Sequence, residues 1–186
     1  MQKSRKNAHL NFTIGTNEFC DYNTPIHWID TSEMDFKEEF VGETFGRINK
    51  AEADLLLSEL KIYINRIGGN RILEEKIDIG IISPYKAQVQ YLRSKIKADA
   101  SLKPYRSLFT VNTVDGFQGQ ERDVIFISLV RANEEGQIGF LNDLRRMNVA
   151  ITRARMKLVI LGEAETLKHH GFYRKLLEFI QNIGNQ

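Results

Sequence analysis

Cysteine is nearly absent from this chain of 186 residues, which contains only Cys20. A single thiol excludes an intrachain disulfide and a cysteine-based zinc cluster, and it is typical of a protein in a reducing compartment. No apolar run has the length needed to cross a membrane, and the basic N-terminal residues are not followed by the apolar stretch of a secretory signal. We therefore expect an intracellular protein, cytoplasmic if its source is bacterial, without a membrane partner.

An excess of charge and two nucleotide-binding motifs are also missing. The net charge is +2, so a nucleic-acid contact would require a local basic patch. There is no G-x-x-x-x-G-K-[ST] sequence, the motif that cradles nucleotide phosphates and supplies a hydroxyl to Mg²⁺, and no acidic Walker B pair after a strand. The histidines, His9, His27, His169 and His170, show no metal-ligand spacing with acids or Cys20. No metal site is predicted.

The residues that are present alternate between short apolar runs and helical patterns. Strands are predicted at 25–30, 77–82, 108–111, 124–130 and 158–161, and helices at 50–66, 86–97, 143–153 and around Phe172, Leu176, Leu177 and Ile180. Strands that alternate with helices favour a mostly parallel sheet covered on both faces, an α/β fold of three layers. We expect this domain to span 25–186, with 1–24 as an N-terminal arm that is poorly ordered or packed on it.

Local signals define the helix ends and the connections. Asn49 is predicted as an N-cap, with Glu52 three residues later completing a capping box. Asn142 or Asp143 is expected to cap the helix that follows. The charged segment 31–47 is expected to be a loop, and 132–139 a polar, hairpin-like excursion.

A glycine loop at 115–121 precedes the run at 124–130. Gly116 and Gly119 allow backbone N–H groups to approach a phosphate, and Glu121 could accept hydrogen bonds from ribose hydroxyls. By itself this spacing favours a plain turn between two elements, because short glycine loops are weak signals.

Four arginines are predicted on the helical segment before the last strand. Arg146 and Arg153 are seven residues apart and would share one face of a helix, where guanidinium groups can bind a phosphate in bidentate fashion. The alternative is a solvated basic face, and we assign Arg145 and Arg155 to it.

A turn at 83–86 follows a strand and opens a helix. Ser83, Pro84, Tyr85 and Lys86 could seat a backbone phosphate at the helix N-terminus, and Thr113 is a similar candidate. Alternatively, this is only a strand-to-helix turn with Tyr85 packed beneath it.

Three of these segments resemble one family in its order and spacing. TVDGFQGQERDVIFISLVRAN and NDLRRMNVAITRAR resemble motifs V and VI of superfamily 1 helicases, and ISPYKAQ resembles an element upstream of them. The similarity is to the branch that includes the nonsense-mediated-decay helicase. It implies the second, C-terminal RecA-like AAA domain of such an enzyme, a P-loop NTPase fold without its own Walker A motif.

The resemblance also implies roles for individual residues. Gly119 would lie by the terminal phosphate of ATP, Glu121 would bind the ribose, and Arg153 would be the catalytic arginine at the terminal phosphate. Arg146 is a weaker ATP-binding candidate. The nucleic-acid contacts would be Ser83, Pro84, Tyr85, Lys86 and Thr113.

The absent motifs imply half of a motor. The family's Tyr-Arg-Met-His-Pro element would lie just upstream of Met1, and the Mg²⁺ ligands would belong to a first RecA-like domain. We expect an excised fragment, or a truncated gene product, that is inactive alone and that completes an ATP site and grips single-stranded nucleic acid in the full-length helicase or translocase. The alternative is a non-catalytic RecA-like module that binds nucleic acid or protein.

Overall fold

The computed structural model describes residues 24–42 and 46–184, so nearly all of the predicted arm lies outside the described residues. Its centre is a parallel sheet with the strand order β1-β7-β6-β4-β5. The strands are β1 (Ile26–Asp30), β4 (Ile79–Ser83), β5 (Phe109–Thr113), β6 (Arg122–Ser128) and β7 (Ala154–Gly162). All of the predicted strands are confirmed, although β7 is longer than its apolar run.

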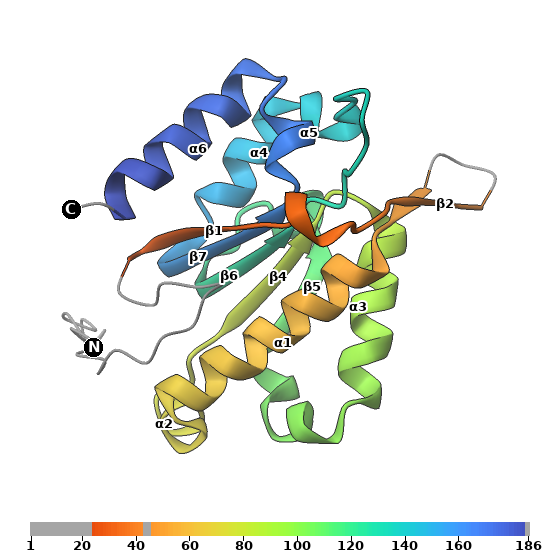
Figure 1. The fold of residues 1–186 in the computed structure, drawn as a ribbon. Coiled ribbons are helices and arrows are strands. Elements are labelled where there is room, and N and C mark those ends of the chain that lie inside the picture. Colours follow the sequence, from red (N-terminus) through yellow and green to blue (C-terminus); the bar gives the residue numbers. More distant parts are fainter. Residues whose placement is uncertain (1–23, 43–45, 185–186) are drawn as a thin grey trace.

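Helices cover both faces of this sheet and complete a three-layer α/β fold (Figure 1). One face is covered by α1 (Lys50–Ile67), α2 (Gly69–Glu74) and α3 (Lys86–Ala98), and the other by α4 (Leu144–Ile151), α5 (Ala164–Leu167) and α6 (Gly171–Gly184). Short 3₁₀ turns lie at η1 (Ser32–Met34), η2 (Ala100–Leu108), η3 (Asp115–Phe117) and η4 (Gly139–Asn142). In the described part of the chain, no helix combines the length and apolarity needed to cross a membrane.

The central strands are apolar on both faces because each face has its own core. In β6, Phe126 packs with α1, α2 and α3, whereas Ile125 and Ile127 point to the core under α4, α5 and α6. In β4, Ile81 and Ile82 divide in the same way. Burying such a side chain contributes about 1.5–3 kcal/mol, which explains the continuous apolar runs.

The segment predicted as a loop at 31–47 contains two short strands that the sequence pattern did not predict. β2 (Glu39–Val41) and β3 (Gly46–Ile48) form a small antiparallel sheet in which Phe40 is paired with Arg47. All residues of β2 are exposed. The usual alternation of buried and exposed residues is therefore missing, and the prediction of a loop is wrong here.

The arginine-bearing helix is shorter than predicted. α4 ends at Ile151, and the hydroxyl of Thr152 donates to the carbonyl groups of Asn148 and Val149. β7 then begins at Ala154, which pairs with Arg122 of β6. Because β7 pairs with β6 from Ala154 onward, the chain leaves the helix earlier than its helical spacing predicted. Arg153 and Arg155 therefore do not lie on the helix.

Candidate nucleotide and nucleic-acid sites

The residues expected to bind ATP meet at the amino edge of the sheet, where β6 and β7 begin. Gly119 and Glu121 lie just before β6, and Arg153 lies just before β7. The backbone N–H of Arg122 donates to the carbonyl of Arg153 at 2.9 Å, which joins the two segments directly. Ligands of open α/β sheets usually bind at the carboxyl ends of strands, so this position is unusual and depends on the loop that returns from β5.

That loop crosses from the carboxyl end of β5 to the amino end of β6. The side chain of Phe117 is fully buried and holds η3 against the core. Gly119 has φ +75°, a conformation that favours glycine, and a Cβ there would meet no atom within 4 Å. Its N–H has no hydrogen-bond partner among the described residues, and Glu121 is exposed. The loop therefore offers an open backbone donor and a carboxylate.

Arg153 is a positioned cation. Its Nε donates to the carbonyl of Val149 at 3.1 Å, and its Nη2 donates to the hydroxyl of Thr152 at 3.2 Å. Within residues 24–42 and 46–184, no acidic side chain pairs with it and its Nη1 has no partner. The end of α4 thus fixes a guanidinium whose charge remains available to an anion.

Arg146 is engaged elsewhere. Its Nε lies 3.2 Å from a carboxylate oxygen of Asp115 and 3.5 Å from one of Asp143. Asp143 is also the N-cap of α4, since it accepts a hydrogen bond from the N–H of Arg146. Arg146 therefore fastens η3 to α4, which favours a structural role, and it does not share a helical face with Arg153.

Arg155 is exposed, as a solvated cation would be, but it is also paired with two acidic side chains. It lies in β7, and its Nη2 is 3.0 Å from a carboxylate oxygen of Asp78 and 3.1 Å from one of Asp123. Each aspartate also accepts a hydrogen bond from the backbone N–H of the other. Burial raises the pKa of Asp123. The guanidinium thus bridges two adjacent carboxyl groups, one just before β4 and the other at the start of β6.

The amino edge fits part of a nucleotide. An exposed carboxylate can bind sugar hydroxyls, and an open N–H with an unpaired guanidinium can bind one phosphate group. In the described residues, no group of three or more His, Cys, Asp or Glu side chains could hold a metal ion. The residues present therefore suit contacts to one side of ATP.

The residues expected to bind nucleic acid meet at the opposite, carboxyl edge. Ser83 and Thr113 end neighbouring strands and are paired in register. α3 begins three residues after Ser83, with Tyr85 as its N-cap, and no side chain accepts the hydrogen bonds of its first turn. Free N–H groups at a helix start favour an anion.

The side chains of this turn differ in accessibility. Ser83 is fully buried, and its hydroxyl accepts the N–H of Tyr85 at 3.4 Å. Tyr85 is 3% exposed, which favours the packing role that the sequence left open over direct contact with a strand. Burial also raises the pKa of its hydroxyl. Lys86 is exposed and Thr113 is half-buried, so these are the groups that a strand could reach.

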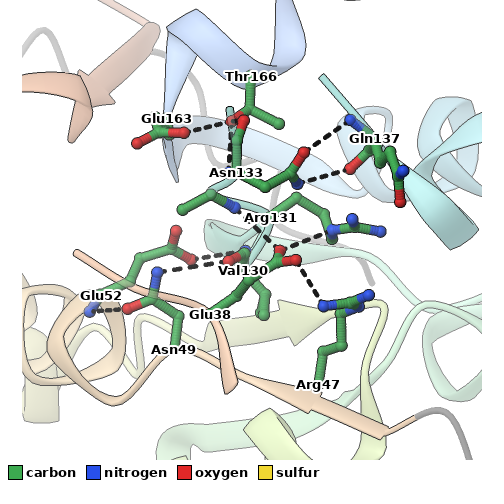
Figure 2. A network of polar contacts seen from close by, with 11 residues as sticks. Glu38, Arg47, Asn49, Glu52, Val130, Arg131, Asn133, Gln137, Glu163 and Thr166 are labelled. Carbon is green, nitrogen blue, oxygen red and sulfur yellow. Dashed lines mark hydrogen bonds and ion pairs between the residues drawn. The ribbon is translucent and has the colours of Figure 1, made fainter. Parts of the chain in front are cut away.

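Sequence reasoning missed a buried polar network beside this edge (Figure 2). Asn49 caps α1 as predicted by accepting the N–H of Glu52, but Glu52 does not close the capping box. The N–H of Asn49 instead donates to the side-chain oxygen of Gln88 in α3 at 2.9 Å. The carboxylate of Glu52 turns to β6, where it accepts the hydroxyl of Ser128 and the N–H of Val130.

The network holds an unusual backbone at the end of β6. Val130 has φ +72°, a strained conformation for a β-branched residue, and its carbonyl accepts the side-chain amide of Asn49. Arg131 follows and is nearly fully buried, where it pairs with Glu38 at 2.7 Å. Glu38 also pairs with Arg47 at 2.6 Å (Figure 2). Only the Asn49–Glu52 spacing signalled part of this arrangement in advance.

The excursion at 132–139 is closed by side chains rather than by strand pairing. The amide group of Asn133 donates to the carbonyl of Gln137, and the N–H of Gln137 donates back to its oxygen. The hydroxyl of Thr166 in α5 accepts the N–H of Asn133 at 2.8 Å (Figure 2). The predicted excursion is therefore present, but it is anchored to α5 and has no hairpin strands.

The parallel sheet, its two helical layers and the motif-bearing loops define a RecA-like domain of the P-loop NTPase fold. A protein-family profile described as "AAA domain" matches residues 2–165. The chain belongs to this family, as the C-terminal domain of superfamily 1 helicases of the Sen1 and nonsense-transcript-regulator type.

Individual relatives agree with this assignment. The chain is 38% identical over 151 residues to "DNA polymerase alpha-associated DNA helicase A" of Saccharomyces cerevisiae, covering 81% of this chain and 21% of that protein. It is 38% identical over 141 residues to "Helicase sen1" of Schizosaccharomyces pombe, covering 76% and 8%. It is 44% identical over 106 residues to "Regulator of nonsense transcripts 1" of Dictyostelium discoideum, covering 56% and 8%. The chain thus spans about a fifth or less of these relatives.

Proposed function

We propose that this chain is the second motor domain of an ATP-dependent DNA or RNA helicase or translocase. In this proposal it completes an ATP site begun by a first RecA-like domain of the same polypeptide, and it grips single-stranded nucleic acid. ATP and Mg²⁺ belong to the full-length enzyme, and the loop and hydroxyl that hold Mg²⁺ belong to the first domain. The chain by itself would be inactive.

The observation that carries the proposal is the unpaired Arg153 beside the open glycine loop. Among the other arginines near this edge, Arg146 and Arg155 have acidic partners at 3.0–3.5 Å, and the guanidinium of Arg122 is hydrogen-bonded to Thr110, Gln120 and the carbonyl of Glu121. Arg153 has no acidic partner in the described part of the chain, yet two of its donor groups are held by the end of α4. A fixed, uncompensated guanidinium is suited to charge that develops on a transferred phosphoryl group.

The two edges support a mechanical cycle. Arg153 and Glu121 would engage ATP only when the two domains close, in the manner of an arginine finger supplied by a second unit. The carboxyl edge, with Lys86, Thr113 and the start of α3, lies at the other end of the same rigid sheet. Closure of the two domains at one edge would therefore move the nucleic-acid-binding groups at the other edge. Each ATP hydrolysed would shift these groups by one step along the nucleic acid.

The test is the ATPase of the full-length protein with saturating single-stranded nucleic acid. Arg153→Ala should lower turnover by about 10³–10⁵-fold, the usual contribution of such an arginine. Part of the loss would be weaker ATP binding. Arg145→Ala is the matched control, because Arg145 is exposed on α4 and has no acidic partner among the described residues. It should change the rate by less than about threefold.

Arg155→Ala is unsuitable as that control, because it removes a cation from the buried Asp123 carboxyl and should therefore lower stability as well. Both assay variants must retain the parent melting temperature within a few degrees. If Arg145→Ala abolishes turnover while Arg153→Ala leaves it intact, the role belongs to another arginine. If the parent protein neither binds single strands nor hydrolyses ATP, the chain is a non-catalytic module.

A further inference from the structure

An exposed aromatic ring stands beside the turn at the carboxyl edge. Phe140 is 51% exposed, although its neighbours Ile138 and Leu141 are buried. Its ring centroid lies 5.5 Å from that of the buried Tyr85, with the two planes inclined by 38°. The contact with Tyr85 covers part of the ring and leaves about half of the residue open to solvent.

The ring is presented by a fixed turn. Gly139 has φ +54°, which favours glycine, and a Cβ there would lie 2.3 Å from Nη1 of Arg131 and 3.0 Å from the hydroxyl of Tyr85, so a larger residue would displace the Arg131 side chain. On the other side, the carbonyl of Leu141 accepts the hydroxyl of Tyr173 at 2.7 Å. Little conformational entropy would be lost if a ligand packed on a ring held in this way.

The groups around the ring favour an anionic ligand. Tyr85, which contacts Phe140, is the N-cap of α3, and the first turn of this 13-residue helix has no side-chain cap. The exposed ammonium group of Lys86 follows directly. The acidic residues of the excursion, Glu134 and Glu135, belong to its tip, where the neighbouring Gly136 lies against the ring of His169.

We propose that Phe140 stacks on a base of single-stranded nucleic acid whose backbone phosphate binds at the start of α3. The inference rests on the proposed function and deepens it by naming the group that holds a base at this edge. The start of α3 would bind the phosphate of a nucleotide, and the exposed ring of Phe140 would bind its base. Both groups adjoin Tyr85, so they lie close enough to serve one nucleotide. Stacking on an aromatic ring tolerates every base, as a protein that moves along a strand requires.

The experiment compares two probes on the full-length protein at one fixed, low salt concentration. One is a fluorescent single-stranded oligonucleotide, and the other is an abasic strand of the same length with the same phosphates. Phe140→Ala should weaken binding of the first by about 5- to 150-fold, the range for loss of one base–aromatic stack. It should change binding of the abasic strand by less than about twofold. Phe140→Trp should retain the parent affinity for both.

Phe179→Ala is the matched control, since Phe179 is 58% exposed on α6. It should leave both affinities unchanged. The inference is overturned if Phe140→Ala binds the fluorescent oligonucleotide as tightly as the parent does. It is also overturned if Phe140→Ala loses the same affinity for both probes, because an equal loss would indicate a structural role. In either case a parent that binds the strand leaves the proposed function standing. A parent that binds neither probe defeats both.

Discussion

Glu52 is a carboxyl group enclosed by the protein at the end of β6. It is fully buried, one of its oxygens accepts the hydroxyl of Ser128 and the N–H of Val130, and the other has no partner among the described residues. Its pKa is raised to about 7, chiefly by burial and to a smaller extent by the negative charge of the nearby Glu163. The hydrogen bonds from Ser128 and Val130 oppose this shift but do not cancel it.

The raised pKa predicts that stability falls with increasing pH. The unfolded chain releases the Glu52 proton near its ordinary pKa of 4.5, whereas the folded chain keeps it to about 7, so stability is lost as the pH rises through this interval. Glu52→Gln resembles the protonated form and removes the effect. Between about pH 5 and pH 8, the free energy of unfolding of the parent should decline relative to that of Glu52→Gln by about 2 kcal/mol.

Urea unfolding at several pH values measures this difference. The raised pKa of Asp123 is common to both proteins and cancels in the comparison. Glu178→Gln, which removes an exposed carboxylate on α6, should leave the parent profile unchanged. Parallel profiles for the parent and Glu52→Gln would show that Glu52 is ionised in the folded protein at neutral pH.

At the scale of elements, one carboxylate joins the β2–β3 sheet to the end of β6. Glu38, whose side chain is 7% exposed, pairs with both Arg131 and Arg47 and also accepts the N–H of Ala132 at 3.0 Å. β3 itself packs beside α3. The small sheet is thereby held to the same edge that carries Tyr85 and Phe140, and its position depends on buried charges rather than on an apolar face.

Loss of one partner should therefore be costly. Arg131→Ala leaves the buried Glu38 with only Arg47, and breaking such a pair typically costs about 3–5 kcal/mol, because a charge remains without full compensation. Arg71→Ala is the control, since its pair with Glu75 is exposed and should contribute less than about 1 kcal/mol. Chemical denaturation of the two variants and the parent provides both values. Equal losses would mean that the Glu38 cluster is no stronger than a surface pair.

At the scale of the whole molecule, the sheet separates two binding edges. Gly119, Glu121 and Arg153 lie where β6 and β7 begin, whereas Ser83 and Thr113 lie where β4 and β5 end. Under the proposed function, a domain with this arrangement would contact a nucleotide from one side only. The phosphate-binding loop that would face it is absent from the sequence.

The purified 186-residue chain should accordingly show no ATPase activity, with or without single-stranded nucleic acid. A sensitive phosphate-release assay is the measurement, and the Arg153→Ala form of the same chain is its control. Turnover that is equal in both forms comes from a contaminant. Turnover by the parent chain that disappears in Arg153→Ala would mean that this half hydrolyses ATP without a partner domain.

The sequence by itself determined the strands of the parallel sheet, most helices and the identity of the motifs, because these depend on neighbours along the chain. The run at 124–130 is apolar throughout because alternate residues of β6 enter two cores, and this is visible without coordinates. Asn49 was recognisable as a cap, and the cap of α4 could be narrowed to Asn142 or Asp143, because a cap bonds within its own first turn. The glycine loop was likewise recognisable from residues close in the chain.

Tertiary structure alone decided which charged and polar groups meet. Arg155 pairs with Asp78 across 77 residues, and Glu52 accepts the N–H of Val130 across 78. The end of α4 at Ile151 follows from the pairing of β7 with β6, which a helical periodicity cannot foresee. Such contacts depend on the order β1-β7-β6-β4-β5, which brings distant segments together at the edges of the sheet. The rules that relate sequence to local structure extend only over a turn or a strand. They therefore could not identify the partners of these side chains.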